Sequence, residues 1–383
     1  MSAPQDVNPA ACRALAEAQY HRCKSDAQAY VGWFEGQFSN YLNAYAAQAL
    51  RPLAEEMIDV CEQQFGDAHP ETARALTNLA RVFVMLGIVE KVEPLLRRAV
   101  AIQEQALQAD HPDRARTLAV LGGYHEGHGD MLAAEPFYKR ALDIRQKVLG
   151  PMHPLTLSAL NNLAKVTLEL GRLVEAEDLS RQVLAAKEHM FGADHPDTAF
   201  ALTALGEVLT KKGMLEEAEP LIRRALAVQQ KHLPPDHPET ALSMWHLSET
   251  LRGLNRLDEA ETLARRTLEI WEGNFGPQHE WTAWGLISLA ETRLAQGAAT
   301  EAAALAERAA CLVQRVYGDD HSVLGSTLNL RGCALLALGE PGAAVATLER
   351  SLQIQLKLAP DGNPAAQATR AMLELAREQM PPG

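Results

Sequence analysis

The sequence predicts an all-α protein, a right-handed α-solenoid of about eight helix pairs between an N-terminal helix and a C-terminal capping helix. One marker, usually His-Pro, recurs every 42 residues; its first residues are His69, His111, His153, His195, His237, His279, His321 and Asn363. A turn marker keeps the same period: Gly87, Gly129, Gly171, Gly213, Asn255, Gly297 and Gly339. Two markers in phase over most of the chain indicate a repeat architecture. No segment alternates apolar and polar residues for long enough to predict a strand.

Each repeat is predicted to hold two helices, and residues 153–194 form its cleanest copy. His153 is expected to cap the first helix, because Pro154 suits a first helical position, where the missing N–H would be unpaired anyway. Apolar residues at helical spacing continue to Leu170. Gly171 is expected to end this helix in a left-handed backbone conformation. A second helix should follow, from about Leu173 to Met190.

Small residues recur where the two helices of a repeat must approach each other. The first helices carry Ala80, Gly122, Ala164, Gly206, Ser248, Ala290 and Gly332. The second helices carry Ala134, Ala176, Ala218, Ala260, Ala302 and Ala344. We therefore expect Ala218 to be tightly packed between the helices of its repeat.

This pattern resembles the tetratricopeptide repeat, which has a small residue midway along its first helix and an alanine early in its second. The usual length of that repeat is about 34 residues. The 42-residue form resembles the repeats of kinesin light chains and their relatives, through the motifs His69–Ala73 (HPETA), Leu160–Ala164 (LNNLA) and Glu217–Leu221 (EAEPL). The resemblance covers roughly residues 27–380. It implies that the first helices line a concave groove, in which basic residues and asparagines hold extended acidic peptides.

The repeat sets the expected domain organisation. Residues 1–26 form an N-terminal tail and helix, residues 27–362 form eight repeats, and residues 363–383 form a capping helix and tail. Repeat 1 departs from the pattern in its first helix, and its second helix is expected from Ala46 to Phe65. The capping helix should run from Pro364 to about Gln379. Stacked repeats contact mainly their neighbours, so the array should behave as one elongated body.

Composition excludes several classes of partner. A formal net charge of −13 argues against nucleic acid, which needs a basic surface. Five scattered cysteines suggest free thiols in a reducing compartment. No apolar run approaches the length of a membrane span, and no basic segment followed by an apolar core suggests a signal peptide. The sequence therefore predicts a cytoplasmic protein without nucleic-acid or membrane partners.

No catalytic, metal or cofactor site is predicted. The sequence has no nucleophile elbow, phosphate-binding glycine loop or paired carboxylates outside the repeat pattern. The His-Pro histidines lie in successive repeats, about 8–10 Å or more apart, so they cannot share one metal ion. His125 and His128 are closer, but no third ligand is near in sequence. The basic pairs have a glutamate four residues earlier, which favours intrahelical ion pairs over an anion-binding strip. These glutamates are Glu93, Glu135, Glu177, Glu219 and Glu261.

The variable face of the first helices is the predicted binding surface, because residues three and four apart share a helix face. The predicted peptide-binding residues are Arg74, Asn78, Arg81, Arg116, Asn161, Asn162, Lys165, Trp245, His246 and Trp284. Asn161 and Asn162 match the LNNLA motif directly, whereas the others match by position. For each residue the alternative is an ordinary exposed helix face, and for the tryptophans it is a role in a loosely packed core.

The leading hypothesis for function is a non-catalytic scaffold that binds an extended, partly acidic protein segment in the groove. Basic residues in the first half of the groove and Glu207, Glu249 and Glu291 in the second half predict a single binding direction. The alternative is a regulatory sensor that changes its superhelical shape on binding a peptide or small ligand. A DNA-binding domain or other output module, which such peptide sensors usually carry, does not fit in the short tails.

Overall fold

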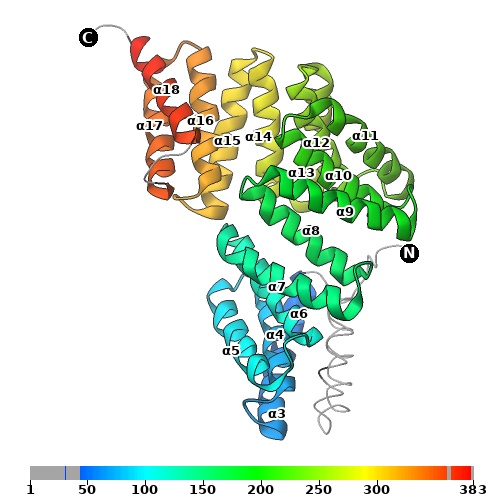
Figure 1. Ribbon diagram of the computed structural model, residues 1–383. Helices are drawn as coiled ribbons and strands as arrows, with labels where there is room; N and C mark the ends of the chain where they lie inside the picture. Colours follow the sequence, from blue (N-terminus) through cyan, green and yellow to red (C-terminus); the bar gives the residue numbers. More distant parts are fainter. Residues whose placement is uncertain (1–30, 32–43, 360–363, 381–383) are drawn as a thin grey trace. The chain divides into compact units, whose positions relative to one another are not determined.

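The computed structural model describes residue 31 and residues 44–359 and 364–380. Within these ranges the chain forms α-helices, one short 3-10 helix and no strand, so the all-α prediction is confirmed (Figure 1). The helices are α3 (Ala44–Phe65), α4 (Pro70–Met85), η1 (Val89–Lys91), α5 (Val92–Ala106), α6 (Pro112–Gly127), α7 (Met131–Leu149), α8 (Pro154–Glu169), α9 (Leu173–Phe191), α10 (Pro196–Lys211), α11 (Leu215–His232), α12 (Pro238–Gly253), α13 (Leu257–Phe275), α14 (Glu280–Ala295), α15 (Ala299–Tyr317), α16 (Ser322–Ala337), α17 (Pro341–Leu358) and α18 (Pro364–Glu378).

The expected N-terminal helix and nearly all of the first helix of repeat 1 lie outside the described residues. From repeat 2 onward each repeat contributes two helices, which we call its A helix and its B helix. The A helices are α4, α6, α8, α10, α12, α14 and α16, and the B helices, including that of repeat 1, are α3, α5, α7, α9, α11, α13, α15 and α17. The C-terminal helix α18 ends at Glu378, close to its predicted end.

The described chain divides after Ala186, inside α9, into two compact units, which we call the N-terminal and C-terminal units. Within the N-terminal unit, α4 packs on α5, α6 on α7, and α7 on α8. Within the C-terminal unit the A and B helices of repeats 5 to 8 pack in the same way, and α18 packs on α17. Each unit is thus a stack of helix pairs in which a B helix also contacts the next A helix, as expected for an α-solenoid.

The histidine of each repeat marker is the N-cap of an A helix, as predicted. Its Nδ1 accepts a hydrogen bond from the backbone N–H two residues later, at 3.1 to 3.3 Å in all seven repeats from His69 to His321. An accepting Nδ1 carries no proton, so the capping tautomer is the one protonated at Nε2. The bond satisfies one of the backbone donors that a helix start leaves without a partner.

The second marker ends the A helices as predicted. All seven residues from Gly87 to Gly339 have positive φ, between 60° and 80°. Asn255 is the only non-glycine residue with positive φ in the part of the chain that the structure describes. Asparagine tolerates this left-handed region better than most residues, which explains why it can replace glycine there.

The small residues of the A helices face the B helix of the same repeat. Where the A helix carries glycine, a large side chain of the B helix packs against it. A Cβ added to Gly122 would lie 2.9 Å from the ring of Tyr138, and one added to Gly332 would lie 2.5 Å from Leu348. Where the A helix carries Ser248 instead, its hydroxyl donates to the backbone oxygen of Ala260 at 2.8 Å. Ala218 is completely buried, in agreement with its expected place between the helices.

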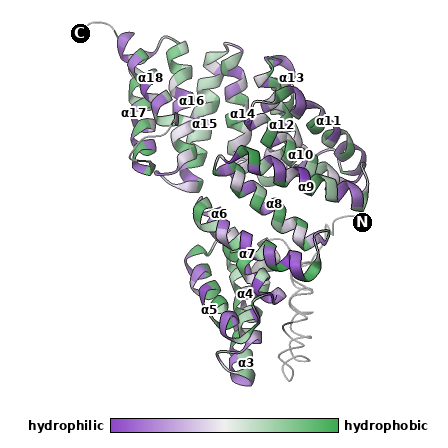
Figure 2. Ribbon diagram, viewed as in Figure 1, coloured by the Kyte–Doolittle hydropathy of each residue, from purple (hydrophilic) through white to green (hydrophobic). Residues whose placement is uncertain are grey.

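The repeat helices carry both hydrophobic and hydrophilic residues (Figure 2). None of the helices within the described ranges is long and apolar enough to cross a membrane. The apolar residues instead form buried clusters between successive helices, such as Leu79, Phe83, Leu96 and Leu121 in the N-terminal unit.

Candidate functional site

The basic pairs of the B helices make structural ion pairs, as the sequence predicted. The expected partner four residues earlier is found in all five cases: Arg97 with Glu93, Lys139 with Glu135, Arg181 with Glu177, Arg223 with Glu219, and Arg265 with Glu261, at 2.6 to 2.8 Å. The second arginine of a pair often reaches the preceding repeat, as Arg98 does to Glu62 at 2.7 Å. These contacts between repeats were not predicted.

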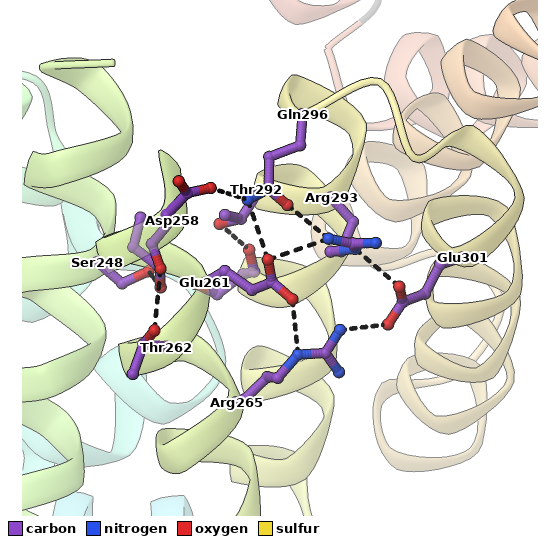
Figure 3. Close-up of polar contacts among 11 residues, drawn as sticks. Ser248, Asp258, Glu261, Thr262, Arg265, Thr292, Arg293, Gln296 and Glu301 are labelled. Atoms are coloured by element: carbon purple, nitrogen blue, oxygen red, sulfur yellow. Dashed lines mark hydrogen bonds and ion pairs between the residues drawn. The ribbon is translucent and has the colours of Figure 1, made fainter. Parts of the chain in front are cut away.

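Figure 3 shows how such pairs join neighbouring repeats in the C-terminal unit. Arg265 of α13 contacts Glu261 on its own helix and Glu301 of α15, at 2.8 and 2.7 Å. Arg293 of α14 lies against the same two carboxylates, at 3.0 and 2.7 Å. Because these arginines already have carboxylate partners, the B helices do not offer a strip of uncompensated positive charge.

The predicted groove residues of α4 differ in accessibility. Arg74 forms ion pairs with Glu71 at 3.1 Å and Asp113 at 3.8 Å, and its side chain is mostly covered. Asn78 is completely buried, so it does not offer its amide to a partner in this structure. Arg81 is half-buried. The prediction of an exposed site at Asn78 is therefore corrected by the packing around it.

On α6 and α8 the predicted residues are accessible. Arg116, Asn161 and Asn162 are half-buried. Lys165 is exposed and forms an ion pair with Glu126 at 2.7 Å, which bridges the A helices of repeats 3 and 4. Peptide binding by these residues stays a prediction.

In the C-terminal unit the predicted tryptophans belong to an aromatic cluster. Half-buried Trp245 lies 5.9 Å from Trp284 and 5.9 Å from Trp271, measured between ring centroids. Trp271 is only 1% exposed and lies 5.2 Å from Trp281. Trp271 therefore has a core role. Trp245 and Trp284 pack in the same cluster and keep part of their surface exposed.

His246 is buried and lies between neighbouring A helices. Its Nε2 is 3.7 Å from Glu207 of α10, and its Nδ1 is 3.4 Å from Glu249. Burial opposes the charged imidazolium, but the carboxylates of Glu207 and then Glu249 outweigh it and raise the pKa of His246. His246 therefore holds two A helices together and is unsuited to direct peptide contact.

The acidic residues predicted for the second half of the groove also have internal partners. Glu207 lies 3.8 Å from Lys211, and Glu291 pairs with Arg252 at 2.8 Å. Burial raises the pKa of the Glu291 carboxyl against the opposing charge of Arg252. Much of the expected negative potential of this face is therefore compensated within the C-terminal unit.

A pocket of about 400 Å³ opens in the N-terminal unit among α4, α6, α7 and α8. Its lining residues are Arg81, Pro112, Arg116, Ala119, Val120, Ile144, Arg145, Val148, Leu149 and Leu155. Sequence reasoning found Arg81 and Arg116 but missed Arg145, which comes from a B helix. The repeat pattern offered no consistent signal for it, because the equivalent positions differ from repeat to repeat: Gln103, Lys187, Gln229, Trp271, Val313 and Gln355.

Neither histidines nor cysteines assemble a metal site in the part of the chain that the structure describes. No group of three or more potential metal-ligating residues occurs there. His128 Nδ1 lies 2.6 Å from the backbone oxygen of Tyr124, and the His125 ring stacks on Phe137. Cys61, Cys311 and Cys333 are free thiols.

Comparison with known proteins identifies the repeats. A family model described as "Tetratricopeptide repeat" matches residues 89–147, 125–189, 157–231, 197–273, 239–310 and 289–357. The chain belongs to the tetratricopeptide repeat family. Its 42-residue period and motifs are of the kinesin light chain-like type. None of the curated proteins compared with the chain matches it.

Several solved tetratricopeptide-type structures are similar to this chain. A structure of nearly identical TPR-like repeats from Podosopora anserina is 26% identical, covers 54% of this chain and 98% of its own, and has a TM-score of 0.46. A Rap protein complexed with competence and sporulation factor has a TM-score of 0.61 at 15% identity, over 93% of this chain and 100% of its own. The apo form of RapI has a TM-score of 0.58 at 12% identity, over 92% and 98%. At these identities the Rap structures show a shared fold and nothing further.

Proposed function

We propose that this tetratricopeptide repeat protein is a non-catalytic interaction scaffold that binds an extended, partly acidic peptide segment on the A-helix face of its N-terminal unit. One observation carries the proposal. In a chain with a net charge of −13, the accessible predicted residues of this face are cationic or amide side chains. They are Arg81, Arg116, Asn161, Asn162 and Lys165.

The chemistry of these side chains suits a peptide backbone with acidic residues. The asparagine amides can each donate to and accept from a main chain, which gives affinity without dependence on sequence. The guanidinium and ammonium groups would select carboxylates and accelerate association through long-range attraction. Lys165 already contacts Glu126, so an incoming carboxylate would share or replace that partner.

The C-terminal unit would contribute a different kind of contact. Trp245 and Trp284 keep part of their rings accessible while the cluster beneath holds them rigid. Rigid aromatic side chains are frequent interface hot spots, because they bury much area at little entropic cost. We propose that they accept apolar residues of a bound protein. The free thiols of Cys61, Cys311 and Cys333 fit the reducing cytoplasm as the compartment.

Selection of short extended peptides from a random displayed library against the full chain tests this function. We expect enrichment of Asp and Glu, with binding that weakens as salt rises. Arg81→Glu combined with Lys165→Glu should slow association about tenfold, which corresponds to about 1.4 kcal/mol in the activation barrier. The matched control combines Arg315→Glu with Lys231→Glu, two exposed B-helix cations of the C-terminal unit.

A second double mutant tests the role of the tryptophans. Trp245→Ala combined with Trp284→Ala should accelerate dissociation and leave the salt dependence nearly unchanged, because an apolar anchor acts through desolvated contact. The proposal is wrong if the selected peptides lack acidic residues and the first double mutant binds them like the control.

A further inference from the structure

The pocket of the N-terminal unit combines three cations with apolar walls. The side chains of Arg81 from α4, Arg116 from α6 and Arg145 from α7 all line it. Most of the remaining lining is aliphatic, and Val148 and Leu155 are 44% and 51% exposed at its edge. A volume of about 400 Å³ lies within the range of small-molecule sites. The pocket can therefore hold a compact ligand that has both an anionic and an apolar part.

Arg145 sets this location apart from most of its counterparts; the equivalent residue of the next repeat, Lys187, is the other cation at this repeat position. Its Nη1 donates to the backbone oxygen of Leu155 at 2.9 Å, and it makes no ion pair with any carboxylate that the structure describes. Arg140, on the same helix, pairs with Glu104 at 3.0 Å. Burial, and then the charge of Arg116, lower the pKa of Arg145. A half-buried guanidinium beside a like charge is costly, and an anion in the pocket would remove that cost.

One junction between repeats of the C-terminal unit fills the equivalent space with aromatic rings. Three repeats later, the positions of Ala119, Arg145 and Leu155 are occupied by three tryptophans, Trp245, Trp271 and Trp281. Those rings pack against each other at 5.2 and 5.9 Å between centroids. The N-terminal unit thus has the same scaffold without the three rings. Ala119 and Arg145 leave open a volume that aromatic side chains fill in the other unit.

We propose that this pocket binds a small organic phosphate, a phosphate monoester carried on an aromatic or similarly compact apolar body. The phosphate would lie against Arg81, Arg116 and Arg145, and the body against the aliphatic walls. A monoester carries about −1.5 to −2 charges at neutral pH, and guanidinium groups bind its oxygens in pairs. Its three acceptor oxygens suit guanidinium groups that come from three helices better than the two oxygens of a carboxylate.

This ligand goes beyond the proposed peptide function and does not depend on it. The pocket shares Arg81 and Arg116 with the proposed peptide-binding face, so a bound phosphate would compete with acidic peptides there. Arg145 belongs to the pocket alone. A change at Arg145 therefore tests the pocket, whereas Lys165, outside the lining, tests the peptide face.

Calorimetric titration of the full chain with phenyl phosphate and with inorganic phosphate tests the proposal. We expect phenyl phosphate to bind at least tenfold more tightly than inorganic phosphate, because its ring would be buried against the aliphatic walls. Arg145→Gln should weaken binding at least tenfold, and Arg140→Gln should leave it unchanged. Both substitutions introduce a residue that this chain already carries at the equivalent position of another repeat, Gln103 and Gln182, so both variants should fold.

A filling variant supplies an independent readout. Ala119→Trp keeps all three arginines and places in the pocket the residue found at the equivalent Trp245. We expect it to abolish phenyl phosphate binding while helix content, measured by circular dichroism, is preserved. Equal binding by wild type, Arg145→Gln and Ala119→Trp would overturn the proposal, as would equal affinity for inorganic and phenyl phosphate. If only a phosphotyrosine peptide binds, the ligand is a phosphorylated protein segment and the small-molecule proposal is wrong.

Discussion

The N-terminal and C-terminal units contain the same kind of helix pair. They differ in the layer of side chains between two neighbouring repeats, which is closed in one unit and open in the other. In the C-terminal unit Trp245, Trp271 and Trp281 close that layer with packed rings. In the N-terminal unit the equivalent residues are part of the lining of an open pocket. The helix caps, turns and small interface residues are alike in both. The repeat markers therefore specify the scaffold, whereas the side chains between repeats can form either a packed core or a binding site.

The charged residues also differ between equivalent positions of the two units. Arg81 of the pocket corresponds to Glu207 three repeats later, and Val120 corresponds to His246. In the C-terminal unit these two residues contact each other at 3.7 Å and contribute to the closed layer. A cationic, open layer and an internally neutralised, closed layer thus occur on one scaffold.

The largest expected effect is the loss of the ring at the centre of the aromatic cluster. Trp271→Ala should destabilise the protein by about 3–5 kcal/mol, because it leaves a large cavity in a closed layer. Arg145→Ala, at the equivalent position of the pocket, should cost no more than about 1 kcal/mol. Denaturant unfolding with circular dichroism measures both. Equal costs would show that the two layers are packed alike and would contradict the difference between a closed and an open layer.

The next effect should be the same in both units, because it concerns the scaffold. Ala134 and Ala218 are both completely buried between the helices of their repeats. Ala134→Leu and Ala218→Leu should each destabilise their unit by about 1–3 kcal/mol through overpacking. Unfolding midpoints by calorimetry provide the measurement. A cost at only one site would mean that the helix pairs of the two units are not equivalent.

A smaller effect with a pH dependence is expected at His246. Because its pKa is raised in the folded state, its stabilisation is present below the pKa of an unfolded histidine and is lost as pH rises through the folded value. His246→Gln should therefore cost about 1–3 kcal/mol near pH 5.5 and clearly less near pH 9. The control is Val120→Gln at the equivalent position, which should show no such pH dependence. A cost for His246→Gln that is independent of pH would contradict the assigned role of the two carboxylates.

The smallest effects should come from exposed ion pairs. Arg97→Gln removes a pair within one B helix and should cost about 0.2–0.5 kcal/mol. Arg265→Gln removes contacts to two carboxylates on different helices and should cost somewhat more, up to about 1 kcal/mol. Both costs should shrink in high salt. A cost above about 2 kcal/mol at either site would indicate that ion pairs, rather than packing, hold the repeats together.

The helices could be predicted from the sequence, because local chemistry sets where they begin and end. A histidine that caps two residues ahead, a proline at the first position and a glycine at positive φ act within one turn of the chain. Their spacing therefore located the described helix boundaries closely. The intrahelical ion pairs were predictable for the same reason, since residues four apart on a helix are neighbours whatever surrounds them.

Only the tertiary structure decided which residues of the variable face are accessible. Asn78 and His246 were predicted on that face, yet both are buried, whereas Asn162 at the same repeat position is half-buried. The pocket could not be predicted from local sequence patterns either. It collects Arg81, Arg116 and Arg145 from three helices that are far apart in sequence, and its volume depends on side chains that are missing there. Burial and cavities are properties of the contacts between repeats, which no single 42-residue pattern contains.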